Sequence, residues 1–302
     1  MVRRGSPSSH SEIAVLSVSP RRAPRLRLLA LALIAGLALA GCAPTGELKV
    51  SGQKVADPVP TVTALTAESG PITGGTTVTI TGTDLADTSS VKFGKVKAAI
   101  TSVKKTSVTV TAPAAAKYKK GKVTVKVVGA SGEKLSFHYE VASGLDKQLA
   151  YVMAHWTTRN LDEYGEIADN DCVNFTSQSL IARGWTMDDD WWHSQEGGVN
   201  SYATAWISST AMMDYLGDHP ELVTALTDDQ RSKVRVGDIV QFDWDNSGDR
   251  DHTGIVTRIT GTGSKTKIFF AGHTLDSDFR SVDTAITKDH PGGTAYYWHL
   301  LK

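Results

Sequence analysis

Residues 171–181 read DCVNFTSQSLI, and they decide the fold of the C-terminal half of this 302-residue chain. Apolar residues recur at helical spacing behind Cys172, an acidic residue precedes it and Gly184 follows the run. The pattern predicts a helix that begins near Cys172 and ends at Gly184. A thiol in the first turn of a helix lies near unpaired N–H groups, which favour its ionised form.

Working outward, an apolar stripe before this helix predicts another one: Leu145, Leu149, Val152, Met153 and Trp156. After it come four short runs typical of strands. They read VGDIVQF at 236–242, DHTGIVT at 251–257, IFFAGHT at 268–274 and YYWHL at 296–300. Residues 145–302 are therefore expected to form an α+β domain with N-terminal helices and an antiparallel sheet.

These segments resemble the papain-like cell-wall hydrolases, including NlpC-type peptidases and CHAP amidases. Most closely they resemble the bacterial putative amidase domain. The resemblance rests on residues 171–178, on 237–242 and on HTLD at 273–276, with Trp206 and Tyr215 between them. It covers the whole of residues 145–301 and implies a papain-like fold.

The resemblance also implies roles in catalysis. Cys172 would be the nucleophile, and His252 would take its proton and pass it to the leaving amine. His273 would orient the His252 imidazole, with Asp276 as the alternative orienter. The Cys172 backbone N–H would bind the oxyanion, and Tyr164 is the candidate for a second donor. The structural alternatives are a buried core thiol for Cys172 and satisfied sheet histidines for His252 and His273.

A different pattern occupies residues 58–141. Residues 70–82 read GPITGGTTVTITG, and Val and Thr alternate there between Gly-rich turns, which predicts an all-β sandwich. This segment, with VKFG at 91–94, resembles the immunoglobulin-like IPT/TIG domain. A spacer is one interpretation. The other is a module that binds an anionic wall polymer through Lys104, Lys105, Lys117, Lys119, Lys120 and Lys122.

The N-terminus indicates export. Four arginines precede an apolar run at 28–40, which is too short to span a membrane. The run ends in LAGC at 39–42, which resembles the bacterial lipobox. The resemblance implies a lipoprotein signal peptide at 1–41, a diacylglycerol thioether on Cys42 and a tether over 42–57. The protein is then expected outside the cytoplasm, anchored by lipid to a bacterial membrane. An ordinary cleaved signal is the alternative.

Composition narrows the classes of function. The chain carries 32 basic and 32 acidic residues, which excludes a strongly basic nucleic-acid binder. The balance differs along the chain, because residues 43–143 hold 13 Lys and seven acids whereas 144–302 hold 13 basic and 24 acidic residues. Only two cysteines are present, which excludes a disulfide-rich scaffold. Lipidation of Cys42 would leave Cys172 as a free thiol.

The acidic run DWDNSGDRD at 243–251 places oxygens at alternate positions around a glycine, as calcium loops do. No cofactor is expected to be required for catalysis, but this loop is a candidate for structural calcium. The twelfth position of such a loop would be Gly254 instead of glutamate, so an acidic hairpin turn is the competing interpretation. The candidate ligands are Asp243, Asp245, Ser247, Asp249 and Asp251.

Together these observations predict an exported cysteine hydrolase of amide bonds that acts on peptidoglycan or its stem peptides, with no nucleic-acid partner. One alternative is a non-catalytic adhesin or envelope assembly protein with a degenerate amidase fold. Another is an acyl transferase. Four tryptophans could line a substrate groove or belong to the core: Trp185, Trp191, Trp192 and Trp206.

Overall fold

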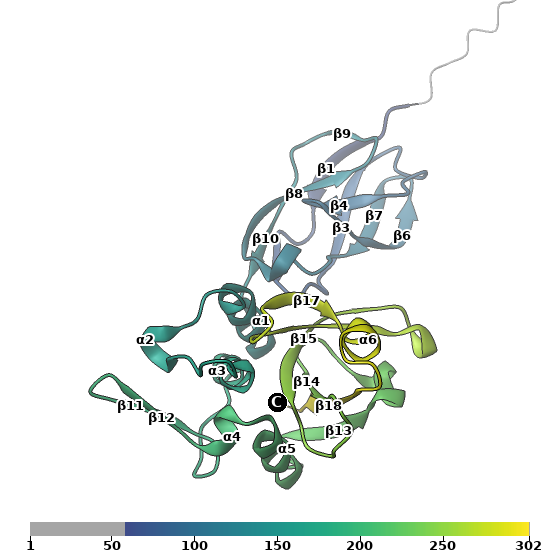
Figure 1. Ribbon diagram of the computed structural model, residues 1–302. Coiled ribbons are helices and arrows are strands. Elements are labelled where there is room, and N and C mark those ends of the chain that lie inside the picture. Colours follow the sequence, from purple (N-terminus) through teal and green to yellow (C-terminus); the bar gives the residue numbers. More distant parts are fainter. Residues whose placement is uncertain (1–57, 302) are drawn as a thin grey trace, which may run out of the picture. The chain divides into compact units, whose positions relative to one another are not determined.

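The computed structural model describes residues 58–301 (Figure 1). The predicted signal peptide at 1–41, the lipidation site Cys42 and the tether at 42–57 lie outside the described residues. Within residues 58–301, no helix has the length and apolar character needed to cross a membrane. The described part holds two segments of different class, an all-β one followed by an α+β one.

The all-β segment consists of two five-stranded sheets, with strand orders β6-β7-β3-β1-β9 and β2-β10-β8-β4-β5. A short helical turn, η1 (Ala116–Tyr118), lies between β7 and β8. The strands are β1 (Thr61–Leu65), β2 (Ser69–Pro71), β3 (Thr77–Thr83), β4 (Val91–Phe93), β5 (Val96–Lys97), β6 (Ala99–Lys104), β7 (Ser107–Thr111), β8 (Gly121–Val127), β9 (Ser131–Gly132) and β10 (Ser136–Glu140).

Alternation of side chains builds this sandwich, as the sequence predicts. In β3, Val78 and Ile80 are fully buried while the threonines beside them stay at least partly exposed. The core is completed by aromatic rings in edge-to-face contact, with the Phe93 and Phe137 centroids 5.2 Å apart. The prediction of an N-terminal all-β domain is confirmed.

The α+β segment begins with helices. Its first helix is capped by Ser143, whose side chain accepts the N–H of Asp146 while the Asp146 carboxylate accepts the N–H of Ser143. Ser143 and Gly144 are therefore the start of this helix. The helices are α1 (Gly144–His155), α2 (Leu161–Tyr164), α3 (Cys172–Arg183), α4 (Thr204–Ile207), α5 (Ser209–Asp218), η2 (Asp228–Lys233), η3 (Gly263–Lys265), α6 (Val282–Thr284) and η4 (Ala285–Asp289).

A six-stranded antiparallel sheet follows, in the order β13-β18-β14-β15-β16-β17, with a separate hairpin of β11 and β12 (Figure 1). Its four central strands are the ones that the sequence predicts. The edge strands β13 and β17 and the hairpin were not expected. The strands are β11 (His193–Glu196), β12 (Val199–Tyr202), β13 (Val223–Thr227), β14 (Ile239–Asp243), β15 (His252–Thr260), β16 (Lys267–Gly272), β17 (Ser277–Ser281) and β18 (Thr294–Leu300).

Both faces of this sheet are covered, so β14 and most of β15 are buried along their length. One face carries Ile239 and Ile255 and belongs to the core that includes α3. The opposite face carries Val240 and Val256, which pack with α6 residues in a second core. The α3-facing side is called the helix face below, and the other side the α6 face. A residue's parity along β15 decides which face it joins.

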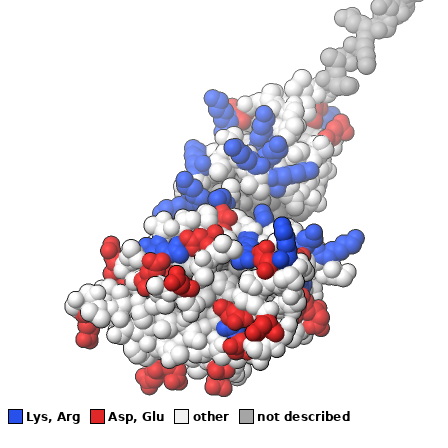
Figure 2. Space-filling view, in the orientation of Figure 1, with Lys and Arg blue, Asp and Glu red and all other residues white. Residues whose placement is uncertain are grey.

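Charge is distributed unevenly over the surface (Figure 2). Lysines gather over the β-sandwich, and acidic side chains dominate the α+β segment. This matches the difference in composition between residues 43–143 and 144–302.

Candidate active site

Cys172 is the first residue of α3, as the sequence predicts, and Gly184 ends the helix in the left-handed conformation with φ 115°. The Cys172 side chain is fully buried. Its Sγ lies 3.7 Å from the Asn170 Oδ1 and 3.7 Å from the Ser209 Oγ. Among residues 58–301, the side chains in hydrogen-bond contact with Sγ are these two, and neither is a base.

Two opposing effects act on the Cys172 thiol. Burial raises its pKa, and the Asp171 carboxylate adds a smaller effect in the same direction. Hydrogen bonds from the Ser209 hydroxyl and from the backbone N–H groups of Thr253 and Val173 lower the pKa. The surroundings of Sγ are therefore rich in donors that would stabilise a thiolate, although burial dominates in this conformation.

The structure does not bring His252 to Cys172. Thr253 lies on the helix face, where its Oγ1 donates to the Ser209 Oγ at 2.9 Å. His252 precedes Thr253 on the strand and consequently lies on the α6 face. Its ring lies 6.0 Å from each of the Phe242 and Trp244 rings, centroid to centroid. No hydrogen bond joins Cys172 and His252 in this structure, and their predicted catalytic pairing stays a prediction.

His252 is held as a neutral ring. Burial, followed by the positive charges of Arg280 and His290, lowers its pKa from 6.5 to about 3. Its side chain is 7% exposed, and its Nε2 is buried without a hydrogen-bond partner. A neutral histidine is able to accept a proton, but this one lies among aromatic rings on the wrong face of the sheet for Sγ.

His273 forms a buried ion pair with the residue that precedes Cys172. Its Nδ1 lies 2.5 Å from the Asp171 Oδ2, and its Nε2 lies 2.8 Å from the His155 carbonyl oxygen. The His155 carbonyl oxygen can only accept, so Nε2 carries a proton, and Nδ1 faces the Asp171 carboxyl group. Phe175 stacks on it with the centroids 4.1 Å apart. The prediction that His273 orients His252 is therefore wrong; His273 fixes the start of α3.

The other two predicted catalytic residues are also engaged elsewhere. Asp276 pairs with the Arg159 guanidinium at 2.5 and 2.8 Å, which lowers the pKa of this carboxyl. Asp276 therefore orients no histidine. Tyr164 is buried and stacks on Trp206, with the ring centroids 5.9 Å apart. No hydrogen bond joins Tyr164 to Cys172 in this structure, so its role as a second oxyanion donor stays a prediction.

A polar network beside Cys172 was not anticipated. Gln241 donates from its Nε2 to the Ser209 carbonyl oxygen at 2.8 Å and to the Thr253 Oγ1 at 3.2 Å. Its Oε1 accepts the Trp298 indole N–H at 2.8 Å. The available signal was the presence of polar Gln241 and Thr253 within otherwise apolar strands, because buried polar side chains need partners.

Of the four tryptophans, two are fully buried, and Trp185 and Trp192 are half-buried. Trp191 and Trp206 are fully buried, and their indole N–H groups donate to Ser177 and Asn174. The interpretation as core residues is confirmed for these two.

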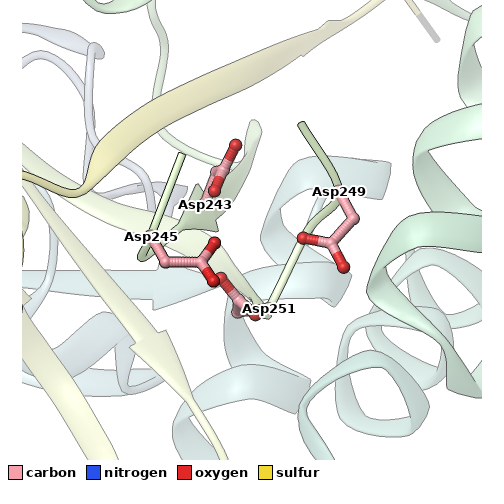
Figure 3. Close-up of side chains that lie close together, drawn as sticks. All are labelled: Asp243, Asp245, Asp249 and Asp251. Carbon is pink, nitrogen blue, oxygen red and sulfur yellow. The ribbon is translucent and has the colours of Figure 1, made fainter. Parts of the chain in front are cut away.

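The acidic hairpin between β14 and β15 brings its carboxylates together (Figure 3). One oxygen from each of Asp243, Asp245, Asp249 and Asp251 lies within 4.8 Å of the others. Asp243 is buried, and its oxygens accept the N–H groups of Ser247 and Gly248. The fifth predicted ligand, Ser247, donates its hydroxyl to Asp249 at 2.5 Å. Four of the five predicted oxygens could therefore surround a cation with little rearrangement.

Comparison with known proteins assigns both segments. The family model of the putative amidase domain matches residues 144–297, and that of the IPT/TIG domain matches residues 60–139. An uncharacterised protein of Bacillus subtilis (strain 168), YhbB, is 30% identical over 112 residues, which are 35% of this chain. The chain spans about a third of that relative's length, 34%.

Two solved structures of the plexin A4 extracellular region are 31% identical over 28% of this chain. The matches cover 9% and 7% of those chains, with TM-scores of 0.25 and 0.24.

Proposed function

Because this chain belongs to the putative amidase domain family, we propose that residues 144–301 hydrolyse an amide bond through a thioester on Cys172. The observation that carries the proposal is the position of Sγ at the start of α3, among donors from Ser209, Thr253 and Val173. Sγ would attack the carbonyl carbon, the amine would leave with a proton, and water would release the acid. Donors of this kind stabilise developing negative charge.

The reaction requires the site to open. Sγ is fully buried, so a substrate reaches it only after the loop before α3 moves; Asn170, which contacts Sγ, belongs to that loop and is exposed. Proton transfer also requires a base. We propose that His252, the first residue of β15, is this base in an open state, because its ring is neutral at pH 7 and it adjoins Thr253, whose N–H lowers the pKa of Cys172. In this account, the geometry described above is a resting state.

The export signal in the sequence supports a proposal for the substrate class and for the location of the protein. We propose a bacterial lipoprotein anchored outside the cytoplasm through Cys42, with a papain-like catalytic domain that acts on peptidoglycan or its stem peptides. The lipobox-like LAGC at 39–42 and the family of the C-terminal domain support this. The β-sandwich would hold the catalytic domain away from the membrane.

A second candidate is a non-catalytic envelope protein built on a degenerate amidase fold. The observation that favours it is the separation of Cys172 and His252 on opposite faces of β15, with Sγ sealed from solvent. A permanently closed thiol without a base would not turn over substrate.

One experiment separates the two candidates. Purified peptidoglycan is incubated with the unmodified chain, with Cys172→Ala and with Cys172→Ser, and newly released amino groups are counted over time. The hydrolase predicts release by the unmodified chain alone, with similar unfolding curves for all three proteins. Equal release by the unmodified chain and Cys172→Ala, or no release by any of them, would reject the cysteine hydrolase.

A further inference from the structure

A pocket on the helix face carries groups that the proposed mechanism does not use. It encloses about 600 Å³ between α5 and the strands β13 and β18. Tyr296 and Trp298 provide an aromatic wall, since their pairing with Gln241 and Ile239 places both on the helix face. Met213 adds apolar surface from α5. Such a wall suits an aliphatic chain.

One edge of this pocket is a buried cation. The Arg250 side chain is 10% exposed, and its guanidinium carbon lies 3.7 Å from the centroid of the Tyr296 ring. Nη1 is occupied by the carbonyl oxygens of Gly248 and Asp249. The backbone of Arg250 is fixed on both sides by the Thr210 hydroxyl. The guanidinium is therefore preorganised.

Part of this guanidinium has no partner. Nε is buried and unpaired, and within residues 58–301 Nη2 makes no hydrogen bond. Asp243 forms a long ion pair with Nη1, with its Oδ2 3.8 Å away, and makes no hydrogen bond to Nε or Nη2. An unpaired buried donor is costly, and the Nε–Nη2 edge matches the two oxygens of a carboxylate.

The lining of this pocket also carries negative charge. Asp214 and Asp218 line the pocket four residues apart on α5, and both are exposed. Neither forms an ion pair or hydrogen bond with the residues that the structure describes. Like charges at this spacing repel each other on a helix, and an ammonium group between them would relieve the repulsion.

We infer that this pocket binds an amino-acid group that carries both a carboxylate and an ammonium on a short aliphatic chain. The carboxylate pairs with the Nε–Nη2 edge of Arg250, the ammonium pairs with Asp214 and Asp218, and the chain lies on Tyr296 and Trp298. A ligand with only one charge would leave either the Nε–Nη2 edge or the two carboxylates without a partner.

The pocket adjoins the candidate active site. Trp298 donates to Gln241, Gln241 donates to the Ser209 carbonyl oxygen, and the Ser209 hydroxyl lies 3.7 Å from Sγ. Thr210, which fixes Arg250, is the next residue after Ser209. This inference rests on the proposed function, because the pocket would then bind part of the substrate. That substrate would be a peptide with a zwitterionic residue near the amide bond to be cut.

Three matched probes test the inference on the full chain. Norleucine carries both charges and a butyl chain, N-acetylnorleucine lacks the ammonium, and norleucine amide lacks the carboxylate. Titration calorimetry should show norleucine binding at least tenfold more tightly than either capped probe. Equal affinity for all three probes would overturn the inference.

Variants then assign each charge to its partner. Arg250→Gln should abolish the preference for norleucine over its amide and keep the preference over the N-acetyl form. Asp214→Asn with Asp218→Asn should do the converse. The control Asp84→Asn with Asp87→Asn removes the same charge from the β-sandwich and should change neither preference. Loss of both preferences in Arg250→Gln, with an unfolding curve like that of the unmodified chain, would contradict the assignment.

Binding is measured without turnover, so the two proposals fail separately. If peptidoglycan is not hydrolysed but norleucine shows the predicted preferences, only the proposed function is wrong. If hydrolysis depends on Cys172 and the three probes bind equally, only the pocket is wrongly assigned.

Discussion

Replacement of His252 by leucine tests which face of β15 this ring occupies. In the structure the native ring is buried and its pKa is lowered from 6.5 to about 3. The unfolded chain takes up a proton as the pH falls through 6.5, whereas the native state does not, so stability is lost on acidification. Between pH 7.5 and pH 4.5 this single group should remove about 2–3 kcal/mol from the free energy of unfolding.

The assay is denaturant unfolding followed by tryptophan fluorescence at several pH values. All seven tryptophans lie after residue 155, so the signal reports the α+β segment. The free energy of unfolding of the unmodified chain, minus that of His252→Leu, should fall by about 2–3 kcal/mol between pH 7.5 and pH 4.5. Phe242→Leu changes the same core without removing a titrating group, and it should shift the profile by a constant amount.

Two results would refute this reasoning. Parallel profiles for the unmodified chain and His252→Leu would mean that the native ring titrates like an exposed histidine. A difference of opposite sign, with stability lost as the pH rises above 6.5, would mean that the native ring is paired with a negative group such as the Cys172 thiolate.

Three further predictions concern other parts of the α+β segment. His273→Ala leaves the Asp171 carboxylate buried without its partner and should cost about 3 kcal/mol or more in unfolding free energy. The Asp276 side chain is 34% exposed, so Asp276→Ala should cost about 1 kcal/mol or less. The reverse ranking in denaturant titrations would contradict the assignment of the Asp171–His273 pair. Millimolar Ca²⁺ should raise the melting temperature relative to chelator, because it neutralises four crowded carboxylates, and the double variant Asp245→Ala, Asp249→Ala should lose the shift; coincident curves would leave an acidic turn. Iodoacetamide should alkylate Cys172 slowly in native protein and rapidly in denaturant, since Sγ is fully buried, and equal rates by mass spectrometry would show that the thiol is accessible.

Local patterns predicted the elements that carry the site. The run behind Cys172 and the glycine at 184 located α3, because helical spacing and a left-handed terminus leave clear marks in sequence. The alternation of Val and Thr likewise located the strands of the sandwich.

The face of the sheet on which His252 lies could not be predicted in the same way. Ile255 and Val256 are both buried, so β15 shows no alternation from which to tell one face from the other, and a shift of one residue moves every side chain across the sheet. The Asp171–His273 pair joins residues 102 apart. Both features depend on packing between distant segments, and a motif carries no information about it.

The central claim is that Cys172 forms a thioester with the acyl part of the substrate. Peptidoglycan fragments are incubated with the full chain, the reaction is quenched in acid, and the tryptic peptide that contains Cys172 is analysed by mass spectrometry. The account predicts an acyl adduct on Cys172 that disappears with hydroxylamine and is absent from Cys172→Ala. Hydrolysis of the fragments with no adduct on Cys172, at an equal rate in Cys172→Ala, would contradict it.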